Sequence, residues 1–303
     1  MSHNKDIERY NQNKINYDRT ILGKNGGIIK SYKNTPYVIA PTKESVFYHR
    51  INKIFDISNY KQPAIPPFLG IEEINDINKI NTRVLRLLIK KNNSYKLRLP
   101  KELEILFPLI NKIMETEFNI NPKFYDYACH LTFDNGEINK NGYQRYPGFH
   151  VDGFQNHDSL LEIHENEHSY VWADNQATLF SLQPYFIEHL NFEVDDLHAE
   201  LNRQTKLDNI YQGVNNGIYL FDPYMVHATP FFKDISQKRN FIRITFEEIQ
   251  LKDPVNSINK MFPKKLQTYI KRIDLRTRLN SIPKDNENSL KTNLEKIGLK
   301  KVY

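Results

Sequence analysis

The chain has 303 residues, of which 39% are hydrophobic and 26% charged, and its formal net charge is +6. This composition is typical of a globular protein with a buried core. The single cysteine, Cys129, excludes a disulfide scaffold and a Cys-rich zinc module. No apolar run approaches the ~18 residues that a membrane span needs. The N-terminus is polar and carries no secretory signal, so we expect a cytoplasmic protein.

The positive charge is concentrated at the C-terminal end. Residues 251–303 contain 13 Lys and Arg but only 5 Asp and Glu, so this segment carries +8 and the remaining 250 residues carry −2. We expect it to be a basic C-terminal extension with a helix over residues 262–280. A basic tail can bind nucleic acid, but a solvated Lys-rich helix explains the same pattern more simply.

The first third of the chain gives mixed signals. Residues 1–95 lack a long periodic pattern and are expected to form an N-terminal α+β elaboration of the core. Within them, residues 79–90 are apolar enough for a buried helix or strand, and periodicity does not decide between the two. Residues 100–118 carry apolar side chains at three- and four-residue steps, which predicts an amphipathic helix. Pro108 falls inside this pattern and is expected to kink the helix.

From residue 123 to residue 250 short apolar runs alternate with turn signals. Asn-Gly dipeptides begin at residues 135, 141 and 216 and favour tight turns. The segment 187–212 is long enough to hold a helix. The expected strands are 124–133, 170–172, 177–182, 218–221 and 241–246. Many short strands with such turns predict an α+β chain with a mainly β core, a jelly roll flanked by helices, which spans residues 96–250 together with the preceding helix.

Three residues in this region have the pattern of a metal site. In a strand, residues i and i+2 point to the same face, so His150 and Asp152 can present an imidazole and a carboxylate side by side. His227 follows a strand-like run far downstream and can supply a third ligand. Two histidines and one carboxylate on one face form the facial triad that holds non-haem Fe(II) and leaves positions open for a cosubstrate and O₂.

Two arginines follow the distal histidine in one alternating strand. Arg239 and Arg243 lie 12 and 16 residues after His227, and Thr245 shares their face. An inward-facing arginine is costly to bury without an anion, and its planar guanidinium matches a carboxylate in a bidentate manner. The strand therefore offers a carboxylate-binding position near the predicted metal.

These residues, in this order and spacing, resemble the iron(II)- and 2-oxoglutarate-dependent oxygenase superfamily over residues 123–250. The resemblance implies a double-stranded β-helix, a form of jelly roll, with Fe(II) held by the three ligands and with 2-oxoglutarate and O₂ as cosubstrates. It also implies an arginine that pairs with the distal carboxylate of 2-oxoglutarate. Arg239, at the start of the strand, fits the family pattern better, whereas Arg243-x-Thr245 resembles a variant of it.

Other polar residues near the triad are candidates for contacts with 2-oxoglutarate or substrate, although the aromatic ones can equally be core. Tyr170 and Thr245 are placed in the cosubstrate site; Thr132, Gln144, Arg145, Gln155, Trp172 and Asn175 are less specific. The expected reaction is hydroxylation of a C–H bond of a small molecule or amino acid, with succinate and CO₂ as coproducts. The segments 153–169 and 187–212 could cover a small pocket.

Three alternatives stay open at this point. His164-Glu165-Asn166-Glu167-His168 is a formal His-Glu-x-x-His, which on a helix binds Zn²⁺ in metallopeptidases, although a strand-like run directly follows it. The basic tail suggests a nucleic-acid base oxidase or demethylase of the same superfamily. A non-catalytic jelly-roll binding module would make His150 and His227 incidental. No membrane partner is expected, and the oligomeric state is not readable from the pattern.

Overall fold

The computed structural model describes residues 29–32, 35–39, 57–62, 65–121, 123–145, 147–152, 167–191, 195–234, 236–247 and 256–262. The α-helices are α4 (Phe107–Ile120) and α6 (Leu197–Gln204), and the 3-10 helices are η1 (Ile57–Lys61), η2 (Ile77–Lys79), η3 (Lys101–Leu106) and η4 (Leu207–Asn209). The strands are β1 (Ile29–Tyr32), β2 (Thr35–Ile39), β3 (Pro67–Ile71), β4 (Val84–Lys90), β5 (Ala128–Asp134), β6 (Glu137–Ile138), β7 (His168–Ala173), β8 (Leu179–Ser181), β9 (Ile210–Gln212), β10 (Gly217–Phe221), β11 (His227–Ala228), β12 (Gln237–Lys238) and β13 (Phe241–Glu247).

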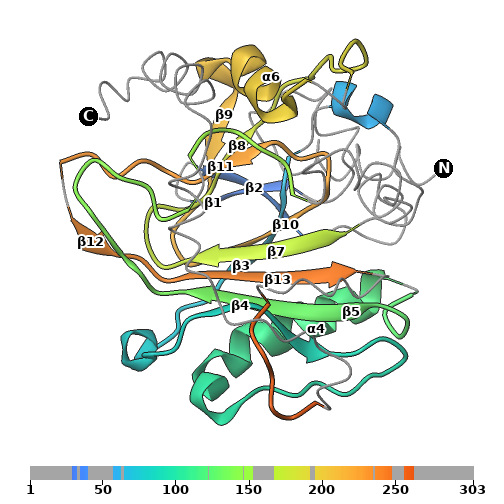
Figure 1. Ribbon diagram of the computed structural model, residues 1–303, viewed down its shortest axis with the longest axis vertical. Helices are drawn as coiled ribbons and strands as arrows, with labels where there is room; N and C mark the ends of the chain where they lie inside the picture. The colour runs from blue at the N-terminus through green and yellow to red at the C-terminus, as the bar shows by residue number, and fades with distance from the viewer. Residues whose placement is uncertain are drawn as a thin grey trace.

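Two antiparallel sheets form the centre of the molecule (Figure 1). The larger sheet has the order β1-β2-β3-β10-β7-β13-β5-β4, with only β2 and β3 parallel. The smaller sheet has the order β11-β8-β9, and an antiparallel bridge between His150 and His227 adds the segment around His150 to its β11 edge. From β5 onward the chain passes repeatedly between the two sheets: β7, β10 and β13 join the larger one, and the His150 segment, β8, β9 and β11 join the smaller one.

Aromatic side chains fill the space between the two sheets. The ring of Phe180 on β8 lies 5.5 Å from that of Tyr219 and 6.5 Å from that of Phe221, both on β10. All three side chains are buried. Because aromatic rings bury large apolar areas, this cluster supplies a large share of the hydrophobic stabilisation between the sheets.

Helix α4 covers the opposite face of the larger sheet (Figure 1). Glu117 of α4 is fully buried and accepts hydrogen bonds from His168 Nε2 at 2.8 Å and from the Tyr170 hydroxyl at 2.7 Å, both on β7. Trp172, on the same face of β7, donates from Nε1 to the Glu72 carbonyl at 2.8 Å. The residues of β7 with even numbers therefore face α4, and those with odd numbers face the space between the sheets.

The structure confirms most of the predicted elements. All five predicted strands are present, and 187–212 contains α6 and β9. Residues 84–90 form a strand. The kink expected at Pro108 is wrong, because α4 begins at Phe107 and the proline lies in the first turn, where its missing N–H has no intrahelical acceptor to lose. The helix expected over 262–280 lies outside the described residues except for Phe262.

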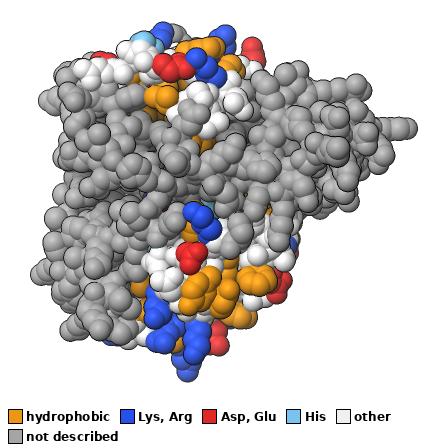
Figure 2. Space-filling view, turned by 90° about the vertical axis from the view of Figure 1, so that its right-hand side faces the viewer, with side chains coloured by type: hydrophobic (Ala, Val, Ile, Leu, Met, Phe, Trp, Pro, Cys, Tyr) orange, Lys and Arg blue, Asp and Glu red, His pale blue; other side chains and the backbone are white. Residues whose placement is uncertain are grey.

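The start of the basic extension packs on the core. The side-chain amide of Asn259 donates to the carbonyls of Leu88 and Arg98, and Phe262 packs against Leu88 and Ala128. Hydrophobic side chains gather at the lower end of the face in Figure 2, with Lys and Arg side chains beside them. Within the described ranges, no helix is long and apolar enough to cross a bilayer.

Candidate metal centre

The three predicted ligands meet between the two sheets. The potential ligand atoms of His150, Asp152 and His227 all lie within 4.8 Å of one another, and His227 Nε2 is 3.6 Å from an Asp152 carboxylate oxygen. His150 and His227 exchange two backbone hydrogen bonds of 2.9 Å, which place their rings on the same side of the sheet with centroids 4.5 Å apart. Asp152, two residues after His150, points to the same face.

Both imidazoles are held by the backbone in the same way. Nδ1 of His150 lies 3.0 Å from the Gly148 carbonyl, and Nδ1 of His227 lies 3.0 Å from the Met225 carbonyl. A carbonyl only accepts, so in each ring Nδ1 carries the proton and Nε2 keeps its lone pair for a metal. Such backbone contacts fix ring orientation as well as tautomer, which is the usual support of a histidine ligand.

The electrostatics put all three residues in the protonation states that bind a cation. Burial lowers the pKa of His150 to about 4, assisted by His227, and burial likewise lowers the pKa of His227. Burial alone would raise the pKa of Asp152, but Arg243 and the two histidines hold it well below its usual range. At neutral pH the site therefore offers two neutral nitrogens and one carboxylate, a donor set that suits Fe(II).

The two predicted anchor arginines have different surroundings. Arg243, on β13, pairs through Nη1 with Asp152, and its Nε is buried without a hydrogen-bond partner in the described part of the chain. Arg239 is 1% exposed. Its Nε donates to the Asn175 and Gln176 carbonyls, and its Nη1 donates to Gln144 Oε1 at 2.5 Å. Arg243 therefore contacts the triad, whereas Arg239 forms hydrogen bonds with the backbone of the turn that follows β7.

The other two predicted cosubstrate residues, Thr245 and Tyr170, lie on opposite faces of the larger sheet. The Thr245 hydroxyl lies 3.0 Å from that of Ser169, on the same face of β13 as Arg243. Tyr170 pairs in register with Ile244 and donates its hydroxyl to Glu117 under α4. The placement of Tyr170 in the cosubstrate site is therefore wrong, since its side chain is on the far side of the larger sheet.

Only the last two residues of the His-Glu-x-x-His pattern lie in the described part of the chain. His168, its second histidine, is the first residue of β7, and its Nε2 pairs with Glu117. Residues 153–166, which include His164, Glu165 and Gln155, lie outside the described residues. Because His168 is a strand residue whose Nε2 already pairs with a buried carboxylate, it does not fit the role of second ligand that the metallopeptidase alternative gives it.

A second layer of buried charged residues lies behind the triad, and no sequence pattern predicts it. Arg86 of β4 pairs with Glu247 of β13 and with Glu167, and His130 Nδ1 lies 3.0 Å from Glu247. Arg86 has φ 43° within an irregular stretch of β4, where the register shifts between Val84 and Leu87. A bulge changes the direction in which a strand side chain points. Here the irregularity in β4 occurs at Arg86, whose guanidinium forms ion pairs inside the protein.

Helix α6 supports the segment that carries His150. Asn202 of α6 accepts from the Phe149 N–H at 2.8 Å and donates to the Phe149 carbonyl at 2.9 Å. The ring of His198 lies 5.9 Å from that of His150. The backbone beside the first metal ligand is therefore paired on both sides of His150, by α6 and by β11.

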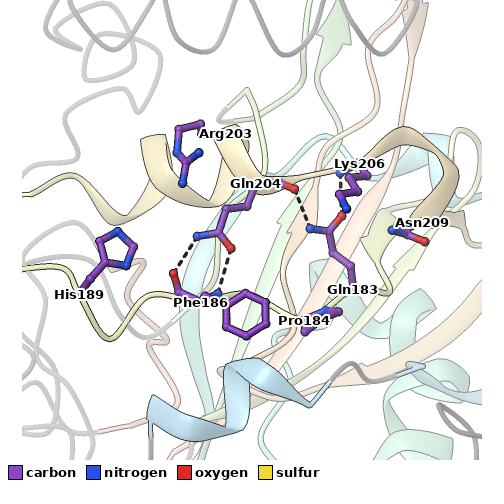
Figure 3. A pocket seen from close by; sticks show the side chains of 8 residues that line it. All are labelled: Gln183, Pro184, Phe186, His189, Arg203, Gln204, Lys206 and Asn209. Atoms are coloured by element: carbon purple, nitrogen blue, oxygen red, sulfur yellow. Dashed lines mark hydrogen bonds between the residues drawn. The ribbon is translucent and has the colours of Figure 1, made fainter.

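A separate cavity of about 510 Å³ opens beside α6 (Figure 3). Its lining includes Phe186, Arg203 and Gln204 but none of the triad residues. The Gln204 side chain is already paired with the backbone of Phe186, as the dashed lines in Figure 3 show. The polar groups here are largely satisfied by one another, so the cavity does not extend the metal site.

Comparisons with known proteins add little. No family model and no curated protein matches the chain. Matching solved structures include an oxidoreductase of the 2OG-Fe(II) oxygenase family from Burkholderia pseudomallei, at 12% identity over 60% of this chain and 83% of that one, with a TM-score of 0.31. Another is EvdO2 from Micromonospora carbonacea var. aurantiaca complexed with 2-oxoglutarate, at 10% identity over 60% and 83%, with a TM-score of 0.26. Because these TM-scores are below 0.5, they carry no argument about function.

Proposed function

We propose that this protein is an Fe(II)- and 2-oxoglutarate-dependent dioxygenase that hydroxylates a C–H bond of a small molecule or amino acid. The observation that carries the proposal is the convergence of His150, Asp152 and His227, whose potential ligand atoms lie within 4.8 Å of one another, with both Nδ1 atoms at hydrogen-bond distance from backbone carbonyls. Fe(II) with bound 2-oxoglutarate would supply the activation of O₂, with succinate and CO₂ as coproducts.

The path of the chain supports the same proposal. From β5 to β13 the chain passes repeatedly between two facing sheets, which is the kind of path expected of a double-stranded β-helix. The triad lies where the smaller sheet faces β13 of the larger one, in contact with Arg243. A site between two sheets is shielded from bulk water, which strengthens every electrostatic interaction within it.

We assign the role of cosubstrate anchor to Arg243 in preference to Arg239. Arg243 is the arginine that touches the triad, and its Nε donor is unused among the described residues. Arg239 also has an unused donor, Nη2, but its Nε and Nη1 already donate to two carbonyls and to Gln144. In the metal-free state Arg243 keeps Asp152 ionised; with metal bound to Asp152, its guanidinium would be available to the distal carboxylate of 2-oxoglutarate.

The test is an anaerobic titration of the metal-free protein with Fe(II) and 2-oxoglutarate, monitored by the visible charge-transfer band of the chelate. We expect the band in the wild type and in His198→Ala, a matched control that removes a neighbouring histidine outside the triad. We expect no band in His150→Ala. A wild type without a band, or a band that persists in His150→Ala, would refute the proposal, and the first result would leave a binding module as the better description.

The choice of anchor has its own test. Equilibrium dialysis of 2-oxoglutarate in the presence of Mn(II) compares Arg243→Gln with Arg239→Gln. We expect a more than tenfold loss of affinity in Arg243→Gln. In Arg239→Gln the main effect should be a lower melting temperature, because its buried partners lose their donor. The reverse pattern would restore Arg239 as the anchor.

A further inference from the structure

A third arginine, Arg145, lies near the triad and has no anionic partner among the described residues. Arg145 is half-buried, and within the part of the chain that the structure describes no carboxylate lies within ion-pair distance of it and no hydrogen bond satisfies it. Its guanidinium lies 5.2 Å from the centroid of the Phe241 ring, at the start of β13. A partly buried guanidinium with unused donors is costly unless an anion occupies it.

Arg145 lies over the face of β13 that carries Arg243. Phe241, whose ring its guanidinium contacts, is two residues from Arg243 on β13, so the two side chains share a face. Arg243 pairs with Asp152 of the triad. Burial is the largest cause that lowers the pKa of Arg145, followed by Arg243.

The carboxylates around Arg145 already have cationic partners. Asp152 pairs with Arg243, Asp134 pairs with Arg83, and Glu167 and Glu247 both pair with Arg86. Among the described residues these pairs leave Arg145 without a carboxylate partner. A substrate that carries an anionic group would supply one.

We propose that Arg145 binds an anionic group of the substrate, a carboxylate or a phosphate, so that this enzyme acts on negatively charged small molecules. The inference rests on the proposed function and narrows its substrate class. In this role Arg145 is a specificity-determining residue, because it would hold the substrate through a charge-assisted, bidentate contact beside the metal while Arg243 holds 2-oxoglutarate.

Arginine modification tests this without knowledge of the substrate. The full-length protein is treated with phenylglyoxal, which reacts with accessible guanidinium groups, and each arginine is followed by peptide mass spectrometry. We expect Arg145 to be modified at a similar rate in the free protein and after loading with Mn(II) and 2-oxoglutarate, whereas Arg243, which is 10% exposed and paired with Asp152, should react slowly in both states. Acetate or methyl phosphate should then slow modification of Arg145 at least threefold, and the more effective anion identifies the substrate group.

Arg203 is the internal control, because it is exposed on α6 and paired only with Glu200, away from the triad. Its modification should not respond to Mn(II) and 2-oxoglutarate. Protection of Arg145 by 2-oxoglutarate itself would overturn the proposal, since Arg145 would then belong to the cosubstrate site. Lack of reaction at Arg145, or protection by neither anion, would overturn it as well.

A variant separates this inference from the proposed function. Arg145→Gln should bind Mn(II) and 2-oxoglutarate with affinities within twofold of the wild-type values in equilibrium dialysis. This variant has no guanidinium at position 145 for phenylglyoxal to modify. A tenfold loss of 2-oxoglutarate affinity in Arg145→Gln would overturn the substrate assignment and leave the oxygenase proposal intact. Failure of the wild type to bind Mn(II) and 2-oxoglutarate would instead refute the oxygenase proposal.

Discussion

Replacing Asp152 by Asn is expected to destabilise the metal-free protein, because it leaves Arg243 buried without its carboxylate. The two side chains are only 11% and 10% exposed. An ion pair at 4 Å is worth about 4 kcal/mol at an effective dielectric constant of ~20. Removing one partner of a buried pair typically costs about 3–5 kcal/mol. We therefore expect Asp152→Asn to lower the free energy of unfolding by about 3 kcal/mol.

A double-mutant cycle measures this coupling directly. Urea unfolding at pH 7 in the presence of a chelator compares the wild type, Asp152→Asn, Arg243→Gln and the double variant. We expect the double variant to be no less stable than Asp152→Asn alone, with a coupling energy of about 2–4 kcal/mol. The Arg83–Asp134 pair, in which Arg83 is 28% exposed, is the matched control and should couple more weakly. A coupling below about 0.5 kcal/mol for Asp152 and Arg243 would refute the reasoning.

Three further predictions concern the support of the site. Burial lowers the pKa of Lys90 to about 8, so between pH 8 and 10.5 the unfolded chain binds more protons and stability should rise with pH; Lys90→Met should remove up to about 2 kcal/mol of that rise in urea titrations, and an unchanged rise would contradict the assignment. Asn202→Ala removes three hydrogen bonds and should lower the free energy of unfolding by about 2–4 kcal/mol in the same assay. A loss of less than about 1 kcal/mol would contradict this and mean that the Phe149 backbone finds other partners. Glu117→Gln should lower the free energy of unfolding by about 2–3 kcal/mol but leave the affinity for Mn(II) unchanged. Loss of Mn(II) binding would mean that the residues between β7 and α4 contribute to the metal site.

The triad could be predicted because its signal is local. His150 and Asp152 are two residues apart, and strand alternation alone places them on one face. The position of His227 needed only a second strand with the right order. The actual pairing of His150 with His227 is a long-range backbone contact, and neither residue carries a local signal for it.

The error at Tyr170 shows where sequence reasoning stopped. A residue on a strand faces one side or the other according to its register, and a shift of one position exchanges the two faces. In the structure Arg243 pairs with Val171 and Ile244 pairs with Tyr170, so Tyr170 falls on the α4 face. That register is set by packing against α4, which the pattern of the strand alone does not contain.

Arg86 and Arg145 illustrate two other limits. Arg86 points into the interior at an irregularity in β4, and the residue types around it do not predict a bulge there. Arg145 was one of several polar residues near the triad, and only the three-dimensional arrangement shows that it has no anionic partner in the described ranges, whereas Arg243 pairs with Asp152. Pairing between charged groups distant in sequence is a tertiary property, so the specific role of each arginine could not be read from the chain.

The mutual backbone pairing of His150 and His227 has a thermodynamic consequence for metal loading. The two segments, 77 residues apart, are joined by reciprocal backbone hydrogen bonds. These hydrogen bonds hold the two histidine ligands together without using their side chains, so a metal would not have to order them as it orders a zinc finger. Calorimetry of Mn(II) binding should accordingly show a heat-capacity change near zero, because little apolar surface would be newly buried. Far-UV circular dichroism should be the same before and after chelation.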